Sequence, residues 1–210
     1  MAIKYTAKVI EHFKSPHNVG VIENADASAT EGSPACGDEI TVYLKIDKAT
    51  DRIEDVKFQS YGCASNIATG SIITDLAKGK TIDEAEAITW KQAADELGGL
   101  PPVKMHCSVL AVDGLRSAIR KYKKDTKGID YDSELDVKAV TEELKHVLWP
   151  PVGVDIITLQ MVKYIGIDQG AVKVEVSISS DDKFLDPTID EIIEHVSKIK
   201  GVKSVNVENV

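Results

Sequence analysis

A polar segment near residue 128 constrains the fold most, because it separates two stretches that differ in charge and in cysteine content. Residues 1–128 contain 17 basic and 18 acidic side chains, whereas residues 129–210 contain 8 and 16, and all three cysteines precede the segment. Domains are joined by exposed polar linkers that few packing contacts cross. The sequence therefore predicts two domains, residues 1–125 and 136–210, with a linker over residues 126–135.

The composition excludes several classes of protein. The formal net charge of −9 repels a phosphate backbone and argues against a nucleic-acid partner. No apolar run approaches the roughly 18 residues of a membrane span, and the opening residues Met1-Ala2-Ile3-Lys4-Tyr5 lack a secretory signal. An odd, sparse set of cysteines argues against a disulfide framework and for a reducing compartment. We expect a cytoplasmic protein with no membrane partner.

The first domain follows an α+β pattern. Apolar residues alternate with polar ones from Ile40 to Ile46, and a turn at 48–51 leads to a second stretch at 53–60. This pattern predicts an antiparallel pair of strands. Helical periodicity is found in four segments, at 5–13, from Gly62 to Leu76, at 82–97 as two short helices, and from Cys107 to Tyr122. The expected domain is a small antiparallel sheet covered by helices.

The second domain is expected to have the order α-β-β-α-β. Its segments are a helix at 137–147, strands at 156–165 and 171–178, a helix at 189–199 and a last strand at 202–207. This order suits a small sheet with both helices on one face.

The three cysteines fall at three junctions between elements. Cys36 lies in the loop that enters the first strand, Cys63 lies between strand and helix, and Cys107 begins the last long helix. A helix N-terminus stabilises a thiolate over a thiol. Small buried hydrophobes are the alternative interpretation. A redox pair lacks Cys-x-x-Cys, a zinc site lacks close pairs of ligands, and His106 is a poor base for Cys107 because adjacent helical residues do not face one another. The spacing favours soft ligands that folding brings together.

Five motifs in this first part resemble the IscU/NifU-type iron–sulfur cluster scaffold. In order, they are Tyr5-Thr6-Ala7-Lys8-Val9-Ile10-Glu11-His12-Phe13, Ser15-Pro16-His17-Asn18-Val19-Gly20, Ala35-Cys36-Gly37-Asp38, Tyr61-Gly62-Cys63-Ala64-Ser65 and Leu100-Pro101-Pro102-Val103-Lys104-Met105-His106-Cys107-Ser108. The resemblance covers residues 1 to about 125, and the order and spacing of all five motifs make it specific.

The resemblance implies a labile [2Fe–2S] cluster that is built on the chain and passed on, rather than an enzyme with its own turnover. In the implied site, Cys36, Cys63 and Cys107 supply three thiolates and Asp38 is the fourth residue. His106 is an alternative ligand, and Lys104 is a neighbouring cation. Cys107 is the implied acceptor of persulfide sulfur. The implied partners are a cysteine desulfurase and recipient apo-proteins, and a homodimer is compatible. Two alternatives stay open: a structural or regulatory module that holds zinc or iron in the same site, and a persulfide carrier that transfers sulfur outside cluster assembly.

The segment Leu100-Pro101-Pro102-Val103-Lys104 carries a further implication. Two consecutive prolines predict an extended segment with few donors that joins neither helix nor sheet. A plain linker that ends a helix is the alternative. In the scaffold family this pentapeptide is bound by a dedicated Hsp70-type chaperone, so the resemblance implies such a partner.

Residues from about 135 to 210 resemble the small PaaD/SufT-like domain of iron–sulfur assembly factors. The resemblance rests on residues 152–159, 170–174 and 199–207. Two features of that family are missing: Trp149-Pro150-Pro151 replaces its Asp-Pro-Glu, and the segment 179–187 has no cysteine. We therefore assign this domain no metal site and interpret it as an acidic interaction module, in which His195 is a surface or core-edge residue.

Overall fold

The computed structural model describes residues 4–33, 37–129 and 135–210. The described residues up to 129 form one compact unit, and those from 135 onward form a second. Among the described residues, no helix combines the length and the apolar character that crossing a membrane requires.

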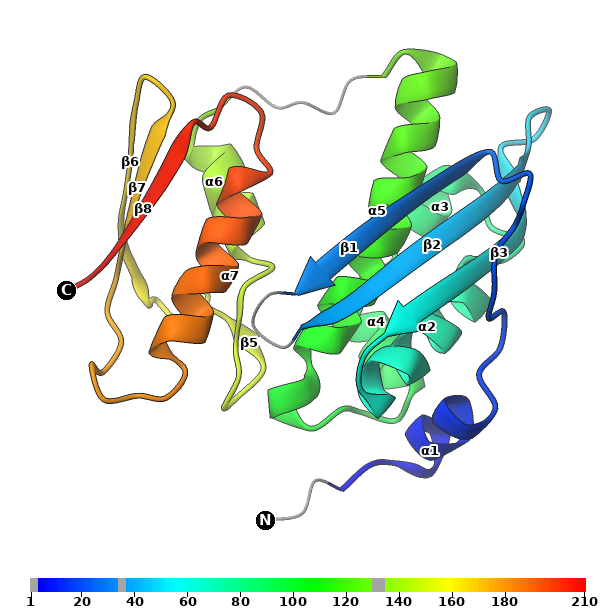
Figure 1. The fold of residues 1–210 in the computed structure, drawn as a ribbon, viewed down its shortest axis with the longest axis horizontal. Coiled ribbons are helices and arrows are strands. Elements are labelled where there is room, and N and C mark those ends of the chain that lie inside the picture. The colour runs from blue at the N-terminus through cyan, green and yellow to red at the C-terminus, as the bar shows by residue number, and fades with distance from the viewer. Residues whose placement is uncertain (1–3, 34–36, 130–134) are drawn as a thin grey trace. The chain divides into compact units, whose positions relative to one another are not determined.

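The first unit is a three-stranded antiparallel sheet with helices packed on it (Figure 1). Its elements are α1 (Ala7–Lys14), β1 (Ala27–Ser33), β2 (Asp38–Asp47), β3 (Arg52–Tyr61), α2 (Ala64–Ala77), α3 (Ile82–Glu86), α4 (Trp90–Glu96), a 3₁₀ turn η1 (Pro102–Lys104) and α5 (His106–Lys127). The strand order is β1-β2-β3, and α5 packs on β1 and β2 while α2 packs on β3. The expected α+β class, a small antiparallel sheet covered by helices, is confirmed.

The alternation in β2 decides which face of the sheet is buried. Ile40, Val42, Leu44 and Ile46 are at most 3% exposed, and the residues between them are more accessible. Because strand side chains alternate between faces, all four apolar side chains lie on the face that carries α2 and α5. The strand β1 was not predicted. Its sequence, Ala-Ser-Ala-Thr-Glu-Gly-Ser, has no bulky apolar residue, and it forms a strand by pairing with β2 from Ala27↔Leu44 onward.

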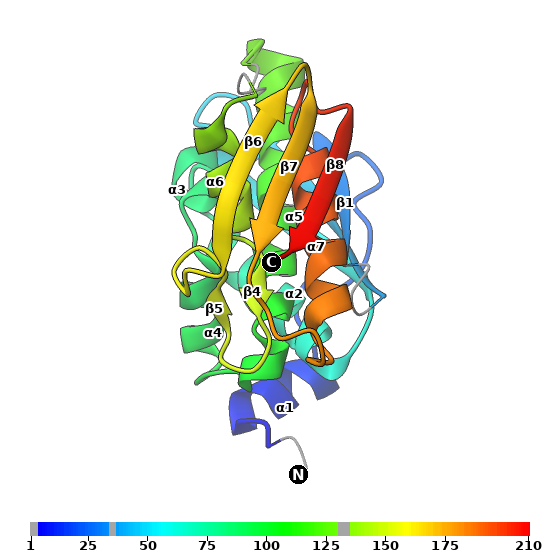
Figure 2. The ribbon, with the colours of Figure 1, turned by 90° about the vertical axis from the view of Figure 1, so that its left-hand side faces the viewer.

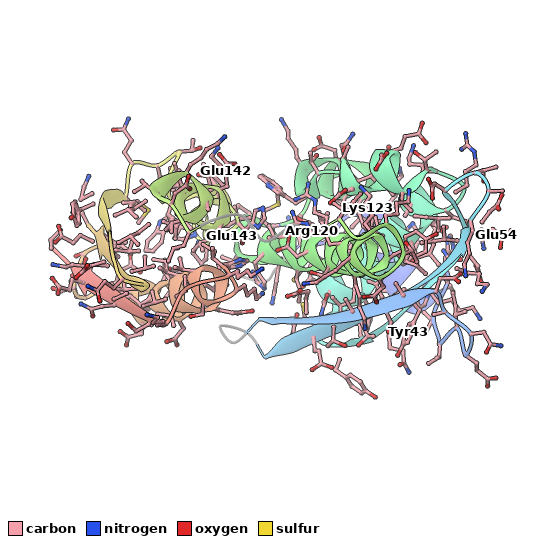
Figure 3. All side chains as sticks on the ribbon, turned by 90° about the horizontal axis from the view of Figure 1, so that it is seen from above. Tyr43, Glu54, Arg120, Lys123, Glu142 and Glu143 are labelled. Carbon is pink, nitrogen blue, oxygen red and sulfur yellow. The ribbon has the colours of Figure 1, made fainter. Side chains whose placement is uncertain are left out.

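One buried cation fixes α5 against α3. The Lys123 ammonium, 6% exposed, lies 2.6 Å from Asp83 Oδ1 and 2.5 Å from Glu86 Oε2. Figure 3 labels Lys123 and the neighbouring Arg120 on α5, and Arg120 Nε lies 3.5 Å from Glu86 Oε1. A buried charge is tolerated when it is paired in this way.

The second unit is a three-stranded sheet, β6-β7-β8, with α6 and α7 behind it in the view of Figure 2. Its elements are α6 (Val137–Leu144), β4 (Leu148–Trp149), β5 (Val154–Asp155), β6 (Val162–Asp168), β7 (Ala171–Val176), α7 (Leu185–Ser197) and β8 (Ser204–Asn209). The expected placement of both helices on one face is confirmed. The β6–β7 pair is antiparallel and β8 runs parallel to β7.

The strand prediction over 156–165 is wrong in its first half. A turn interrupts it: the Thr158 N–H donates to Asp155 Oδ1 at 2.7 Å, and Gln160 has a φ of 55°. The carboxylate of Asp155 thus holds a local turn that alternation of apolar residues does not reveal. The strand starts only at Val162, and Leu148–Trp149 pairs with Val154–Asp155 as a short hairpin.

Candidate metal centre

Four of the predicted site residues meet where three elements begin. Asp38 is the first residue of β2, Cys63 is the N-cap of α2, and His106 and Cys107 are the first two residues of α5. Cys63 Sγ lies 3.7 Å from Cys107 Sγ, and Cys107 Sγ lies 4.0 Å from Asp38 Oδ2 and 3.5 Å from His106 Nε2. Asp38, His106 and Cys107 each offer an atom within 4.8 Å of the others. The fold therefore brings soft and hard donors to one point.

Gly62 makes this convergence possible. A Cβ at residue 62 would lie 2.7 Å from Asp38 Cγ and 2.6 Å from Asn66 Nδ2, closer than real side-chain atoms approach. Only glycine leaves room there for the Asp38 carboxylate beside the start of α2. The Cys63 N–H donates to Asp38 Oδ2 at 3.4 Å. On the next turn, the Thr69 hydroxyl donates to the Cys107 carbonyl oxygen at 3.0 Å, which joins α2 to the start of α5.

The environment of Cys63 favours its thiolate. A hydrogen bond from the Cys107 thiol, the Asn66 backbone N–H and the charge of Lys104 together lower the pKa of Cys63 to about 6, against the opposing effect of burial and of Asp38. Cys63 is half-buried and Cys107 is fully buried. A pKa near 6 makes the Cys63 thiolate available at neutral pH.

The pKa values of the two basic neighbours, His106 and Lys104, are shifted in opposite directions. Burial lowers the pKa of His106, and the charge of Lys104 lowers it further, so the imidazole is neutral and able to accept a proton or bind a metal. Burial also acts to lower the pKa of Lys104, but the negative charges of Cys63 and Cys107 outweigh it and raise this pKa above its usual value. Lys104 therefore stays charged beside the thiolates.

The expectation that His106 and Cys107 cannot face one another is wrong. His106 Nε2 and Cys107 Sγ are 3.5 Å apart because the two residues form the first turn of α5, where the imidazole can fold back over the helix end. The spacing rule holds for side chains that project from a helix interior.

The segment Leu100–Lys104 is less extended than the two prolines predict. Pro102 opens the 3₁₀ turn η1, in which the Lys104 N–H donates to the Pro101 carbonyl oxygen at 2.7 Å. Proline is tolerated at the first helical position, because its missing N–H would have no partner there. Leu100 packs partly buried against the core of the unit, whereas Pro102 is exposed.

The remaining two predicted site residues are Cys36 and Lys104. Cys36 lies outside the described residues. Lys104 lies close enough to Cys63 and Cys107 for their negative charges to raise its pKa. Sequence reasoning missed Asn66, whose backbone N–H lies near enough to the Cys63 sulfur to lower the pKa of that thiol, although it forms no capping hydrogen bond. The available signal was position, since residue N3 of a helix that begins after Cys63 offers its N–H to the N-cap side chain.

In the second unit, His195 has one neighbour from α6 and one from the residues that follow α6. Its Nδ1 lies 3.6 Å from Glu143 Oε2, and the His146 ring lies edge-on to it with ring centroids 5.7 Å apart. This cluster arises because α6 and α7 pack together. Sequence alone places His195 on α7 but not beside a second histidine.

The fold and the site together define a small α+β domain in which the starts of three elements bring thiols, a carboxylate and an imidazole close together. The chain belongs to the family described as NifU-like N terminal domain, whose model matches residues 4–129. The model of a family described as iron-sulfur cluster assembly protein matches residues 138–208. Both expected resemblances are thereby confirmed.

Three known proteins illustrate the likeness. The iron-sulfur cluster assembly scaffold protein IscU 1 of Archaeoglobus fulgidus is 50% identical over 141 residues, which span 67% of this chain and 91% of that protein. The IscU scaffold protein of Escherichia coli is 47% identical over 57% of this chain and 94% of its own length. The crystal structure of the N-terminal part of a nitrogen-fixing NifU-like protein from Brucella abortus is 23% identical, covers 58% of this chain and 95% of that one, and has a TM-score of 0.47.

Proposed function

We propose that this protein is an iron–sulfur cluster assembly scaffold that builds a labile [2Fe–2S] cluster on Cys36, Cys63 and Cys107 and transfers it to apo-proteins. The observation that carries the proposal is the 3.7 Å separation of the Cys63 and Cys107 sulfurs beside the Asp38 carboxylate. Sequence relatives named as IscU scaffolds support it.

We propose that sulfur reaches this chain by transfer from a persulfide. A cysteine desulfurase carries sulfane sulfur as a persulfide. A thiolate of this chain attacks that sulfur, a new S–S bond forms, and the desulfurase cysteine leaves as a thiolate. Cys107 is the proposed acceptor, as the resemblance to the scaffold family implies, and the Cys63 sulfur and His106 Nε2, 3.7 Å and 3.5 Å from its sulfur, are the neighbours that could take its proton.

The ligands of the proposed site explain why the cluster would be labile. Three thiolates satisfy soft iron, and the remaining position falls to Asp38 or His106, which bind it less strongly than a fourth sulfur would. Iron and sulfide are cargo here, so a weak fourth ligand serves release. A structural or regulatory zinc module would use the same residues in a closed tetrahedral site.

Anaerobic reconstitution of the full chain with desulfurase, cysteine, iron and a reductant tests the function. We expect visible absorption, acid-labile sulfide, and transfer to an apo-ferredoxin. Single Cys36→Ser, Cys63→Ser and Cys107→Ser variants should each lose the cluster. Stoichiometric zinc without reconstitution would favour the zinc module, and dependence on a single cysteine would favour a persulfide carrier. Either result would overturn the proposal.

Replacing the weak fourth ligand should prolong the life of the cluster. In Asp38→Ala the carboxylate that competes with cluster sulfur for iron is gone, so we expect slower transfer to apo-ferredoxin and a longer half-life, each by several-fold. The exposed neighbour Glu39→Ala serves as the control. Absorbance decay and transfer rates give the measurement, and an unchanged or shortened half-life would contradict the assigned role of Asp38.

The partners follow from the same proposal. The Leu100–Lys104 segment, with Pro102 exposed, is the proposed contact for an Hsp70-type chaperone, and a homodimer could share a cluster. The proposed location is the cytoplasm. The second unit, which matches an iron–sulfur assembly family, is proposed to act as an interaction module for cluster delivery.

A further inference from the structure

A second cluster of metal-binding side chains lies on the first unit, away from the cysteines. His12 of α1, His17 of the following loop and Asp75 of α2 each offer a ligand atom, and these atoms all lie within 4.8 Å of one another. Asp75 follows Cys63 by twelve residues along α2, which corresponds to about 18 Å of helix. The cluster is therefore separate from the candidate metal centre.

We propose that His12, His17 and Asp75 form a second, mononuclear site for a divalent first-row transition metal ion. The two imidazoles, with no sulfur, are ligands that suit Fe²⁺, Zn²⁺ or Ni²⁺, the Asp75 carboxylate orients His17, and water would complete the coordination.

The hydrogen bonds around the two rings hold them ready for a metal. His17 Nδ1 lies 2.6 Å from Asp75 Oδ2, so its N–H donates to the carboxylate and Nε2 keeps a lone pair. His12 Nδ1 lies 2.8 Å from Ser71 Oγ, and when that N–H donates to the hydroxyl, His12 Nε2 is likewise available. Metal-binding histidines characteristically donate their other ring N–H in this way.

The carboxylate is itself held in place. The Asn18 side-chain amide donates to Asp75 Oδ1 at 2.9 Å and to Thr74 Oγ1 at 3.1 Å, and the His17 backbone N–H donates to Ser71 Oγ at 2.8 Å. Asn18 has a φ of 54°, a left-handed conformation that asparagine adopts more readily than most residues. These bonds fix the loop after α1 on α2, and this loop carries one of the two imidazoles.

The charge state and the access also suit a metal ion. Burial and the nearby His17 lower the pKa of His12, so its ring is neutral near pH 7. The ring centroids of His12 and His17 are 4.9 Å apart, close enough for one ion to contact both. His12 is buried, but the His17 and Asp75 side chains are 54% and 34% exposed, so an ion can enter from solvent.

Calorimetric titration of the full-length protein with Zn²⁺ tests the site, after one equivalent has filled the cysteines. We expect a further binding event that is lost in His17→Ala and weakened about 10–100-fold in Asp75→Asn, the usual effect of removing a carboxylate that orients a metal-binding histidine. Glu11→Gln is the matched control, because it removes an acidic charge on α1 next to His12 but none of the proposed site residues. This variant should bind zinc like the parent protein.

A parallel titration with Co²⁺ identifies the ligands. At the proposed site cobalt should give only weak visible bands, without the intense near-ultraviolet absorption of a thiolate complex, and His17→Ala should remove one equivalent of these bands. Circular dichroism tests whether both variants are folded. We expect that they are, because the His17 side chain is exposed and its loss leaves no cavity in the core. If His17→Ala and Asp75→Asn bind zinc as the parent does, or if every bound cobalt shows thiolate absorption, the cluster is a structural clamp between α1 and α2 and the proposal fails.

Discussion

Alkylation of Cys63 in the metal-free protein is expected to reach half of its maximal rate near pH 6. The Cys107 thiol, the Asn66 N–H and Lys104 lower the pKa of Cys63 to about 6, whereas an unperturbed thiol titrates near 8.5. Only the thiolate reacts. At pH 6 the thiolate fraction of Cys63 is therefore roughly 150 times that of an ordinary cysteine.

At high pH, Cys63 is expected to be alkylated more slowly than an ordinary thiol. A thiolate of lower pKa is intrinsically less nucleophilic, by roughly tenfold for this shift. We expect Cys63 to react about ten times faster than an ordinary thiol at pH 6 and about ten times slower above pH 9. Iodoacetamide labelling, followed by mass spectrometry of the peptide that contains Cys63, separates it from the other cysteines.

Two comparisons sharpen this test. The same peptide labelled in denaturant should show an ordinary midpoint near pH 8.5. Cys107→Ala removes the largest stabilising contribution and should move the midpoint of Cys63 upward, and Lys104→Gln should move it less in the same direction. A folded parent protein whose Cys63 titrates near 8.5 would contradict the described arrangement of the thiols.

Gly70→Ala should destabilise the first unit, although alanine is the better helix former. A Cβ at residue 70 would lie 2.5 Å and 2.6 Å from two ring carbons of Phe58 and 3.1 Å from Ile40 Cδ1. Phe58 is 1% exposed and Ile40 fully buried, so neither can move into solvent. Overpacking of this kind costs about 1–3 kcal/mol, which exceeds the gain of about 1 kcal/mol from helix propensity over most of that range.

Gly114→Ala provides the matched comparison, because its Cβ would meet Ile40 and Val42 at 3.1 Å and 3.3 Å. We expect a change in its free energy of unfolding close to zero. Hydrogen exchange of the β2 and α5 amides reports on this unit alone. Phe58→Leu should relieve part of the defect of Gly70→Ala in a double-mutant cycle. Equal or greater protection in Gly70→Ala would refute the argument.

The sequence predicts the parts of the fold that follow from a local pattern of apolar side chains. The alternation of Ile40, Val42, Leu44 and Ile46 indicates a half-buried strand because burial follows the two-residue period. It does not reveal β1, whose small residues become a strand only through pairing with β2. Nor does it reveal the Asp155 turn, which depends on a single hydrogen bond to the Thr158 N–H.

The same distinction holds for the two groups of candidate metal ligands. Cys63 and Cys107 could be assigned from motifs and from their positions at helix starts. The room for Asp38 beside Cys63, however, depends on the missing side chain of Gly62, which is a property of packing. His12, His17 and Asp75 come together only because Asn18 and Ser71 hold the loop after α1 against α2, and no local pattern encodes a contact over such a separation.

The short distance between η1 and α5 has a mechanical consequence. A single residue, Met105, lies between the end of the 3₁₀ turn and His106, the first residue of α5. A protein that straightened Pro102–Lys104 would shorten or rotate the first turn of α5 and displace His106 and Cys107 together. A force on an accessible surface segment would thus be transmitted to two candidate metal ligands at once, without unfolding of the sheet beneath them.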